Sequence, residues 1–309
     1  MIRLPVMSLR RRLPTLSLAV GLAILGVGQG LALVDAGRSE PPVRLRLAYE
    51  QDEVLRYDTE VSADGAVSSG VLTEDLEMQM RFVMKLTVLD VDEDGVATLA
   101  AGIESGSATI NGRTVPIEQV AAGVEGRTMR IAPDGAVLTG PGGLTTSVTG
   151  PASFPGVGTL APLLPHHPVA PGDHWDSGAT ITIGEEGPAL TVRAESRFEG
   201  YGSVRGRRAA VIAVTSEAPM NFTANLGELA AATGQSVDLG PQADLSVTYS
   251  GSATSEGRNW VDVERGIQLR SEVTAHVDFE FRLEGSTTTP ASEPPTDFEV
   301  DFGFAMELR

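Results

Sequence analysis

The chain has 309 residues and a formal net charge of −18, with 41 acidic residues against 23 basic ones. Nucleic-acid binding requires clustered basic side chains, and attraction to anionic lipid surfaces requires them too, so this charge balance argues against both. The sequence contains no cysteine, which excludes disulfides, thiolate chemistry, cysteine-ligated metals and a cysteine-attached lipid anchor. No motif predicts a cofactor.

Residues 1–36 have the pattern of an export signal. Four arginines, Arg3 and Arg10 to Arg12, precede an uncharged apolar stretch at residues 13–34. A cationic start before an apolar segment is how signal peptides and signal anchors are built. The stretch is close to the roughly 20 residues that span a bilayer, whereas the core of a signal peptide usually has about 7–15. We therefore expect export to the periplasm, the cell surface or the medium. Residues 1–36 are either a cleaved signal peptide or a retained membrane anchor.

The strongest structural signal is alternation of apolar and polar residues. It occurs in residues 76–88, 273–283 and 298–308. Alternation of period two predicts strands with one buried face and one wet face, which is typical of antiparallel sheet. We therefore expect an all-β fold, mainly antiparallel sheet, in the form of a half-open barrel or a curved sheet. One or two short helices are expected, at residues 116–124 and 226–233.

Composition divides the remainder of the chain into three parts. A first β-rich half is expected at residues 43–140 and a second at residues 169–309. Between them, residues 141–168 are rich in glycine and proline and lack periodicity, which predicts a connection. Within the first half, Asp94-Gly95, Asn111-Gly112 and Asp134-Gly135 predict tight turns between strands.

Residues 164–175 read Leu-Pro-His-His-Pro-Val-Ala-Pro-Gly-Asp-His-Trp. This segment resembles the LPxxPVxxGDxW signature of an uncharacterised family of exported bacterial β-rich proteins, a domain of unknown function. Residues 88–97 and 260–266 agree with the same family. The resemblance implies export and β structure, and it supplies no catalytic residue. In physical terms, Gly172 and Asp173 predict a turn, and Trp175 is expected to anchor the following strand.

Two groups of residues have ligand types that suit a metal. Asp90, Asp92 and Asp94 match the start of a calcium loop, but loop position twelve, which needs a bidentate acid, is Ala101. An acidic hairpin turn is the simpler interpretation. The three histidines nearest one another, with Asp173 and Asp176 close by, have side chains that suit zinc. No HExxH pair is present, however, and a solvated loop is the preferred interpretation. These histidines are His166, His167 and His174.

No catalytic motif is found: GxSxG, a P-loop and a strand-to-helix GxGxxG are all missing from the sequence. We therefore expect a protein that is not an enzyme. A hydrolase with an unrecognised carboxylate site is the third hypothesis for function, behind two non-catalytic ones.

The methionine-rich stretch of residues 78–84 suggests the leading hypothesis. Its apolar positions are Met78, Met80, Phe82 and Met84. Methionine adapts to varied apolar partners, so this face is either ordinary core or the lining of a groove for a lipid or another apolar ligand. The leading hypothesis is a non-catalytic envelope protein that binds such a ligand. The alternative is a structural or protein-binding module of the envelope without a ligand cavity.

Overall fold

The computed structural model describes residues 41–69, 72–117, 128–139, 146–147, 163–182, 189–219, 221–225, 246–284 and 296–309. The expected export signal lies outside these residues, and so do the expected helices at 116–124, apart from its first two residues, and at 226–233. Within the described ranges, no helix has the length and hydropathy needed to cross a bilayer.

The described residues form fourteen strands in a single sheet whose pairs are antiparallel, which confirms the predicted all-β fold. The first half of the chain contributes β1 (Val54–Ser69), β2 (Leu72–Val91), β3 (Ala97–Ile110), β4 (Arg113–Val115), β5 (Thr128–Ile131) and β6 (Val137–Thr139). The rest contributes β7 (Thr146–Ser147), β8 (His174–Thr182), β9 (Ala189–Val204), β10 (Arg207–Pro219), β11 (Phe222–Asn225), β12 (Ser246–Asp262), β13 (Gln268–Glu284) and β14 (Thr296–Leu308).

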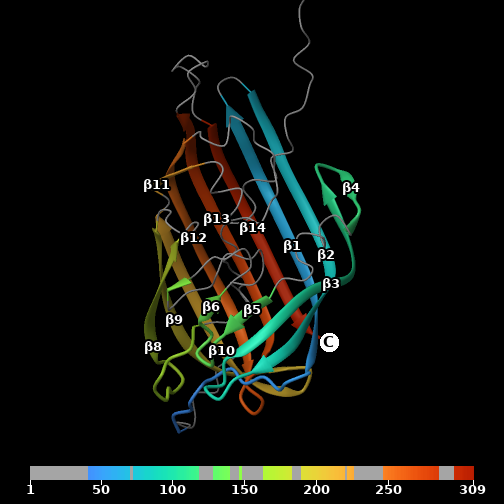
Figure 1. Cartoon of the computed structure of the whole chain (residues 1–309), viewed down its shortest axis with the longest axis vertical. Helices are drawn as coiled ribbons and strands as arrows, with labels where there is room; N and C mark the ends of the chain where they lie inside the picture. The colour runs from blue at the N-terminus through green and yellow to red at the C-terminus, as the bar shows by residue number, and fades with distance from the viewer. Residues whose placement is uncertain are drawn as a thin grey trace, which may run out of the picture.

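The two halves of the chain meet in the middle of this sheet. The strand order is β6-β5-β3-β2-β1-β14-β13-β12-β10-β9-β8-β7, with β4 added to β3 and β11 added to β12. The first long strand, β1, pairs with the last, β14, from Tyr57 opposite Leu308 to Ser69 opposite Thr296. Figure 1 shows β12, β13, β14, β1 and β2 side by side along the length of the molecule. The sheet curves but stays open, because β6 and β7 at its two ends do not pair.

Glycines inside the strands permit this curvature. A Cβ on Gly106 of β3 would lie 2.5 Å from the carbonyl oxygen of Arg81 and from the Cβ of Phe82. A Cβ on Gly251 of β12 would lie 2.2 Å from the carbonyl oxygen of Asp278. A side chain therefore does not fit at either position, and strand-interior glycines of this kind mark bends and close backbone approach.

The lower end of the sheet is closed by the segment that precedes β1, drawn in dark blue in Figure 1. Its backbone donates hydrogen bonds from Val43 to Val169, from Leu47 to Pro133 and from Ala48 to Gly266. Its side chains at alternate positions, Leu45, Leu47 and Tyr49, are buried. We call this end the base. The opposite end of the long strands is the upper end.

Candidate functional site

One face of the sheet is apolar across seven neighbouring strands, from β2 to β9, and we call it the inner face. Strand register brings its side chains together. Val61 of β1 lies opposite Met80 of β2 on one side and Phe304 of β14 on the other. The same relation continues outward, where Phe304 lies opposite Val273 of β13. Cross-strand neighbours of this kind are the units that stabilise a sheet, so the inner face is one continuous surface.

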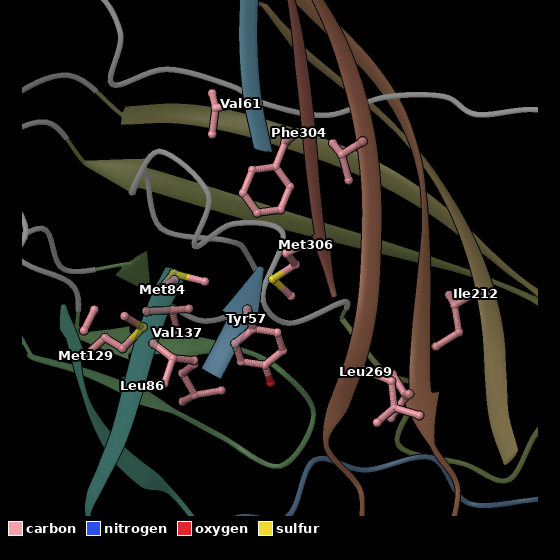
Figure 2. Close-up of a cluster of buried hydrophobic side chains, with 14 of the residues drawn as sticks. Tyr57, Val61, Met84, Leu86, Met129, Val137, Ile212, Leu269, Phe304 and Met306 are labelled. Carbon is pink, nitrogen blue, oxygen red and sulfur yellow. The ribbon is translucent and has the colours of Figure 1, made fainter. Parts of the chain in front are cut away.

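The methionine stretch singled out in the sequence lies on this inner face. Met78, Met80 and Met84 are between 6% and 9% exposed, and Phe82 is half-buried. Figure 2 shows Met84 gathered with Tyr57, Phe304 and Met306 on the interior side of their strands. The structure therefore brings the four predicted residues together, and it adds partners from β1 and β14 that the pattern of one strand does not identify.

An aromatic cluster lies at the upper end of the inner face. It consists of Phe222, Tyr249, Phe279, Phe281 and Phe298. The ring centroids of Phe222 and Tyr249 are 4.7 Å apart and those of Phe279 and Phe298 are 4.8 Å apart, which are distances of favourable aromatic pairing. Partial burial raises the pKa of Tyr249. One third of the fifteen aromatic residues in the chain therefore gather at this end.

Closer to the base, the inner face carries polar groups. The hydroxyls of Ser216 in β10 and Ser255 in β12 lie 2.6 Å apart. The hydroxyl of Ser196 in β9 is buried and has no hydrogen-bond partner among the residues that the structure describes. Ser196 and Ser216 are diagonal neighbours, because Ser196 pairs with Val214 and Ser216 pairs with Ala194. We call Ser196, Ser216 and Ser255 the serine group.

A second polar network lies below the serine group. The side-chain oxygen of Asn259 accepts hydrogen bonds from the Gln268 amide at 3.0 Å and from the Ser271 hydroxyl at 2.9 Å. The amide oxygen of Gln268 is buried and accepts no hydrogen bond from any described residue. The phenol of Tyr57 donates to the backbone oxygen of Gln268 at 2.9 Å. Burial, more than the nearby Tyr49 and Glu53, raises the pKa of Tyr57 well above its usual range.

Sequence reasoning missed both polar groups. The available signal was a serine in a position where the alternating pattern demands an apolar residue. Ser271, for example, immediately precedes the apolar alternation that begins at Val273.

Among the described residues, no charged side chain lies on the inner face of β9, β10, β12 and β13 beside the serine group. The inner face there and on the neighbouring strands consists of apolar residues, glycine, serine, threonine, asparagine, glutamine and tyrosine. They include Leu55, Tyr57, Thr59, Val61, Ala63, Met78, Met80, Met84, Val300, Phe302, Met306, Val273, Ala275, Val277, Ala253, Ile212, Ala218 and Phe198. The charged side chains of the same strands alternate with these residues and lie on the other face, which we call the outer face.

The predicted calcium loop is a hairpin turn between β2 and β3. One carboxylate oxygen of Asp92 accepts from the backbone of Asp94 at 3.1 Å and of Val96 at 2.9 Å. Its other oxygen accepts from the Arg130 guanidinium at 2.8 Å. The carboxylate is therefore already neutralised and hydrogen-bonded by the protein. Asp90 is exposed and belongs to the end of β2.

The predicted histidine site is not assembled either. His166 lies 3.6 Å from Asp134, while His174 lies 3.7 Å from Glu195, so the two histidines face different carboxylates. His167 is exposed. Across the residues that the structure describes, no group of three histidine or carboxylate side chains is placed to hold a metal ion.

The neighbouring Trp175 has a structural environment. Its indole nitrogen donates to the backbone oxygen of Leu163 at 2.8 Å, and the ring is half-buried against the core. The preceding turn is held by Asp173, whose carboxylate accepts from the backbone of Ala170 at 2.8 Å. Gly172 in this turn has a φ of 98°, a conformation that favours glycine.

A small open depression of about 320 Å³ lies at the base, outside the inner face. Arg44, Arg46 and Glu264 are among its lining residues. The buried Asp262, which also lines it, is held by Arg207 at 2.6 Å and by the backbone of Glu264 and Arg265, both at 2.8 Å. This carboxylate shapes the turn between β12 and β13, which makes the depression a product of that turn.

Comparison with known proteins identifies neither a family nor an activity for this chain. No protein-family model and no curated protein matches the chain. Among solved structures, the chain is similar to the crystal structure of the hypothetical lipoprotein YmcC from Escherichia coli. The sequences are 10% identical, the match covers 78% of this chain and 85% of that one, and the TM-score is 0.22. A likeness of this level establishes neither a shared activity nor a shared ligand.

Proposed function

We propose that this protein is a non-catalytic exported envelope protein that holds an apolar ligand, such as a lipid acyl chain, against the inner face of its sheet. The observation that carries the proposal is the continuity of that face. The register joins apolar side chains from both ends of the chain into one surface, although each strand alone presents only a narrow stripe.

The composition of the inner face suits an apolar chain. Methionine and phenylalanine supply polarizable, adaptable contacts, and the surface holds Met80, Met84, Met306, Phe302 and Phe304. Burying each methylene of an acyl chain in such surroundings contributes about 0.8 kcal/mol. All described strands belong to one curved sheet, so the described residues that surround this face come from the sheet itself and from the segment that closes the base.

The two ends of the inner face support a direction of entry. The base is closed by the segment around Leu47 and its backbone hydrogen bonds. The upper end carries the half-buried aromatic rings of Phe222, Tyr249 and Phe281. An apolar ligand would then enter past the aromatic cluster and lie along the long strands. The export signal expected at residues 1–36 supports a location in the envelope, where lipids are abundant.

The proposal is tested with N-phenyl-1-naphthylamine, an uncharged dye that fluoresces in apolar surroundings. The protein is produced with its own leader, purified from the envelope fraction without alkyl detergent, extracted with organic solvent vapour to remove lipid, and titrated. We expect saturable binding of about one dye per chain.

Two adjacent residues of β2 supply the matched variants. Met80 is on the inner face and Gln79 is exposed on the outer face, so Met80→Glu should abolish dye binding and Gln79→Glu should not. Circular dichroism establishes that the variants remain folded. Absence of saturable dye binding by the wild type would contradict the proposal and favour the module without a ligand cavity.

A further inference from the structure

The serine group is unusual in an otherwise apolar surface. Ser196 is 1% exposed, yet its hydroxyl has neither a donor nor an acceptor partner in the described part of the chain. A buried hydroxyl left without a hydrogen bond costs about 1–3 kcal/mol, and native proteins tolerate few such groups. An alanine at this position would fill nearly the same volume without that cost, so the hydroxyl needs a reason other than packing.

Two further serine hydroxyls lie next to Ser196. Ser216 lies diagonally across β9 and β10, and its hydroxyl shares one hydrogen bond with that of Ser255. Each serine hydroxyl has one proton to donate and two lone pairs to accept. The Ser255 hydroxyl also lies 3.5 Å from the backbone oxygen of Ser216. The group therefore keeps the donor of Ser196 and several acceptor lone pairs unused at one place on the inner face, within a surface that is apolar above it.

We propose that the serine group binds an uncharged polar group of the ligand, such as a hydroxyl, an ester or an amide, so that the ligand is a neutral amphiphile. This inference rests on the proposed function, whose apolar ligand it makes more specific. The polar group lies toward the base and the apolar chain extends along Val273, Val277 and Phe279 toward the aromatic cluster.

The absence of charge around the serine group excludes an ionised ligand group. A carboxylate or phosphate buried without a cation partner is strongly disfavoured, and a quaternary ammonium without an anion partner is disfavoured for the same reason. The inner-face neighbours of the group include Trp175, Val214, Ala194, Ala253 and Ala275, and none of them carries a charge. Serine hydroxyls recognise neutral donors and acceptors, which hydroxyl, ester and amide groups all provide.

The test compares three ligands with the same ten-carbon chain: 1-decanol, decanoate at pH 8 and decyltrimethylammonium. Each is titrated as a competitor of N-phenyl-1-naphthylamine bound to the purified protein. We expect 1-decanol to displace the dye at concentrations at least tenfold lower than either charged ligand does, after correction for micelle formation.

The variants Ser196→Ala and Ser252→Ala test whether the preference for 1-decanol over the charged ligands arises at the serine group. Ser252 lies on the other face of β12, so its loss should change nothing. Ser196→Ala should weaken the binding of 1-decanol about fivefold, which is the effect of one hydrogen bond. It should leave the affinity for decanoate unchanged. Because the variant removes an unpartnered hydroxyl, its melting temperature should equal or exceed that of the wild type.

The outcomes separate the two proposals. If the protein binds neither dye nor any of the three ligands, the proposed function fails, and this inference fails with it. If all three ligands compete equally, or if Ser196→Ala leaves the preference for 1-decanol unchanged, the inference is overturned while the apolar site stands.

Discussion

Asp64 of β1 lies directly opposite Asp301 of β14, and on its other side it lies directly opposite Glu77 of β2. Three carboxylates thus form a row across three strands on the outer face. Asp301 has His276 at 2.9 Å, but Asp64 forms no ion pair with any described residue. Like charges directly opposite one another destabilise a sheet.

Asp64→Asn should therefore stabilise the protein by roughly 0.2–1 kcal/mol, because it removes two repulsive cross-strand pairs. The effect should shrink between 10 mM and 500 mM salt, since salt screens exposed charges. Urea denaturation at both salt concentrations measures it. Asp58→Asn in the same strand is the control, because Asp58 pairs with Arg309 at 2.6 Å, and its loss should not stabilise. Equal effects of the two substitutions would contradict this account.

The strands were predictable from the sequence, but their partners were not. Alternation in residues 76–88 and 298–308 predicted both strands and identified Met80 and Phe304 as inward-facing. Met80 lies opposite Val61 because β1 and β2 are consecutive strands. The position of Phe304 opposite Val61 depends instead on the pairing of β1 with β14, which are more than 200 residues apart in the chain. Nothing in a local pattern specifies such a partner. The hairpin turn at Arg205-Gly206, with φ of 48° and 81°, was also missed, because arginine is not a usual turn signal.

The candidate site was predictable in the same partial way. Its methionines alternate with polar residues in residues 78–84 and are visible as a pattern. Ser196 and Ser255, in contrast, look like ordinary strand residues, because small polar side chains occur on both faces of wet strands. Their burial follows from the curvature of the whole sheet, which depends on residues such as Gly106 and Gly251.

Gly106→Ala should destabilise the protein by about 1–3 kcal/mol, the usual cost of forcing an extra methyl into a filled space. The new Cβ would lie 2.5 Å from backbone and side-chain atoms of β2. Gly102→Ala in the same strand is the matched control, since its Cβ would have no neighbour within 4 Å. Urea denaturation of both variants measures the difference. A Gly106→Ala variant as stable as Gly102→Ala would show that this bend does not require glycine.

The stability of the protein should fall at alkaline pH. Burial raises the pKa of Tyr57 and of Tyr49, with the charge of Glu53 adding to the rise for Tyr49. The folded state therefore retains phenol protons that the unfolded chain loses near pH 10. This contribution is fully present below about pH 10 and decreases above it, by up to about 1.4 kcal/mol per pH unit for each tyrosine.

Tyr57→Phe removes one of these two tyrosines. The free energy of unfolding should then fall less steeply above pH 10, by up to about 1.4 kcal/mol per pH unit. The substitution should also cost about 1 kcal/mol at neutral pH, because the hydrogen bond to Gln268 is lost. Free energies of unfolding between pH 8 and pH 11.5 measure both effects. A slope identical to that of the wild type would contradict the assignment of a raised pKa to Tyr57.

Trp175→Ala should lower the free energy of unfolding by about 3 kcal/mol, near the lower end for a large aromatic, because the ring is half-buried. Trp175→Phe keeps most of the packing and loses the hydrogen bond to Leu163, so it should cost about 1 kcal/mol. Thermal unfolding ranks the two. Unchanged stability with lost dye binding would instead make Trp175 part of the ligand site.

The central claim is that the inner face holds an apolar ligand. Native mass spectrometry tests it most directly, on protein purified from the envelope fraction of its host without added lipid. We predict one bound molecule per chain, extractable by organic solvent, uncharged, and absent from a folded Met80→Glu variant. A spectrum that shows only the unliganded mass, from a protein that also binds no apolar dye, would contradict the account.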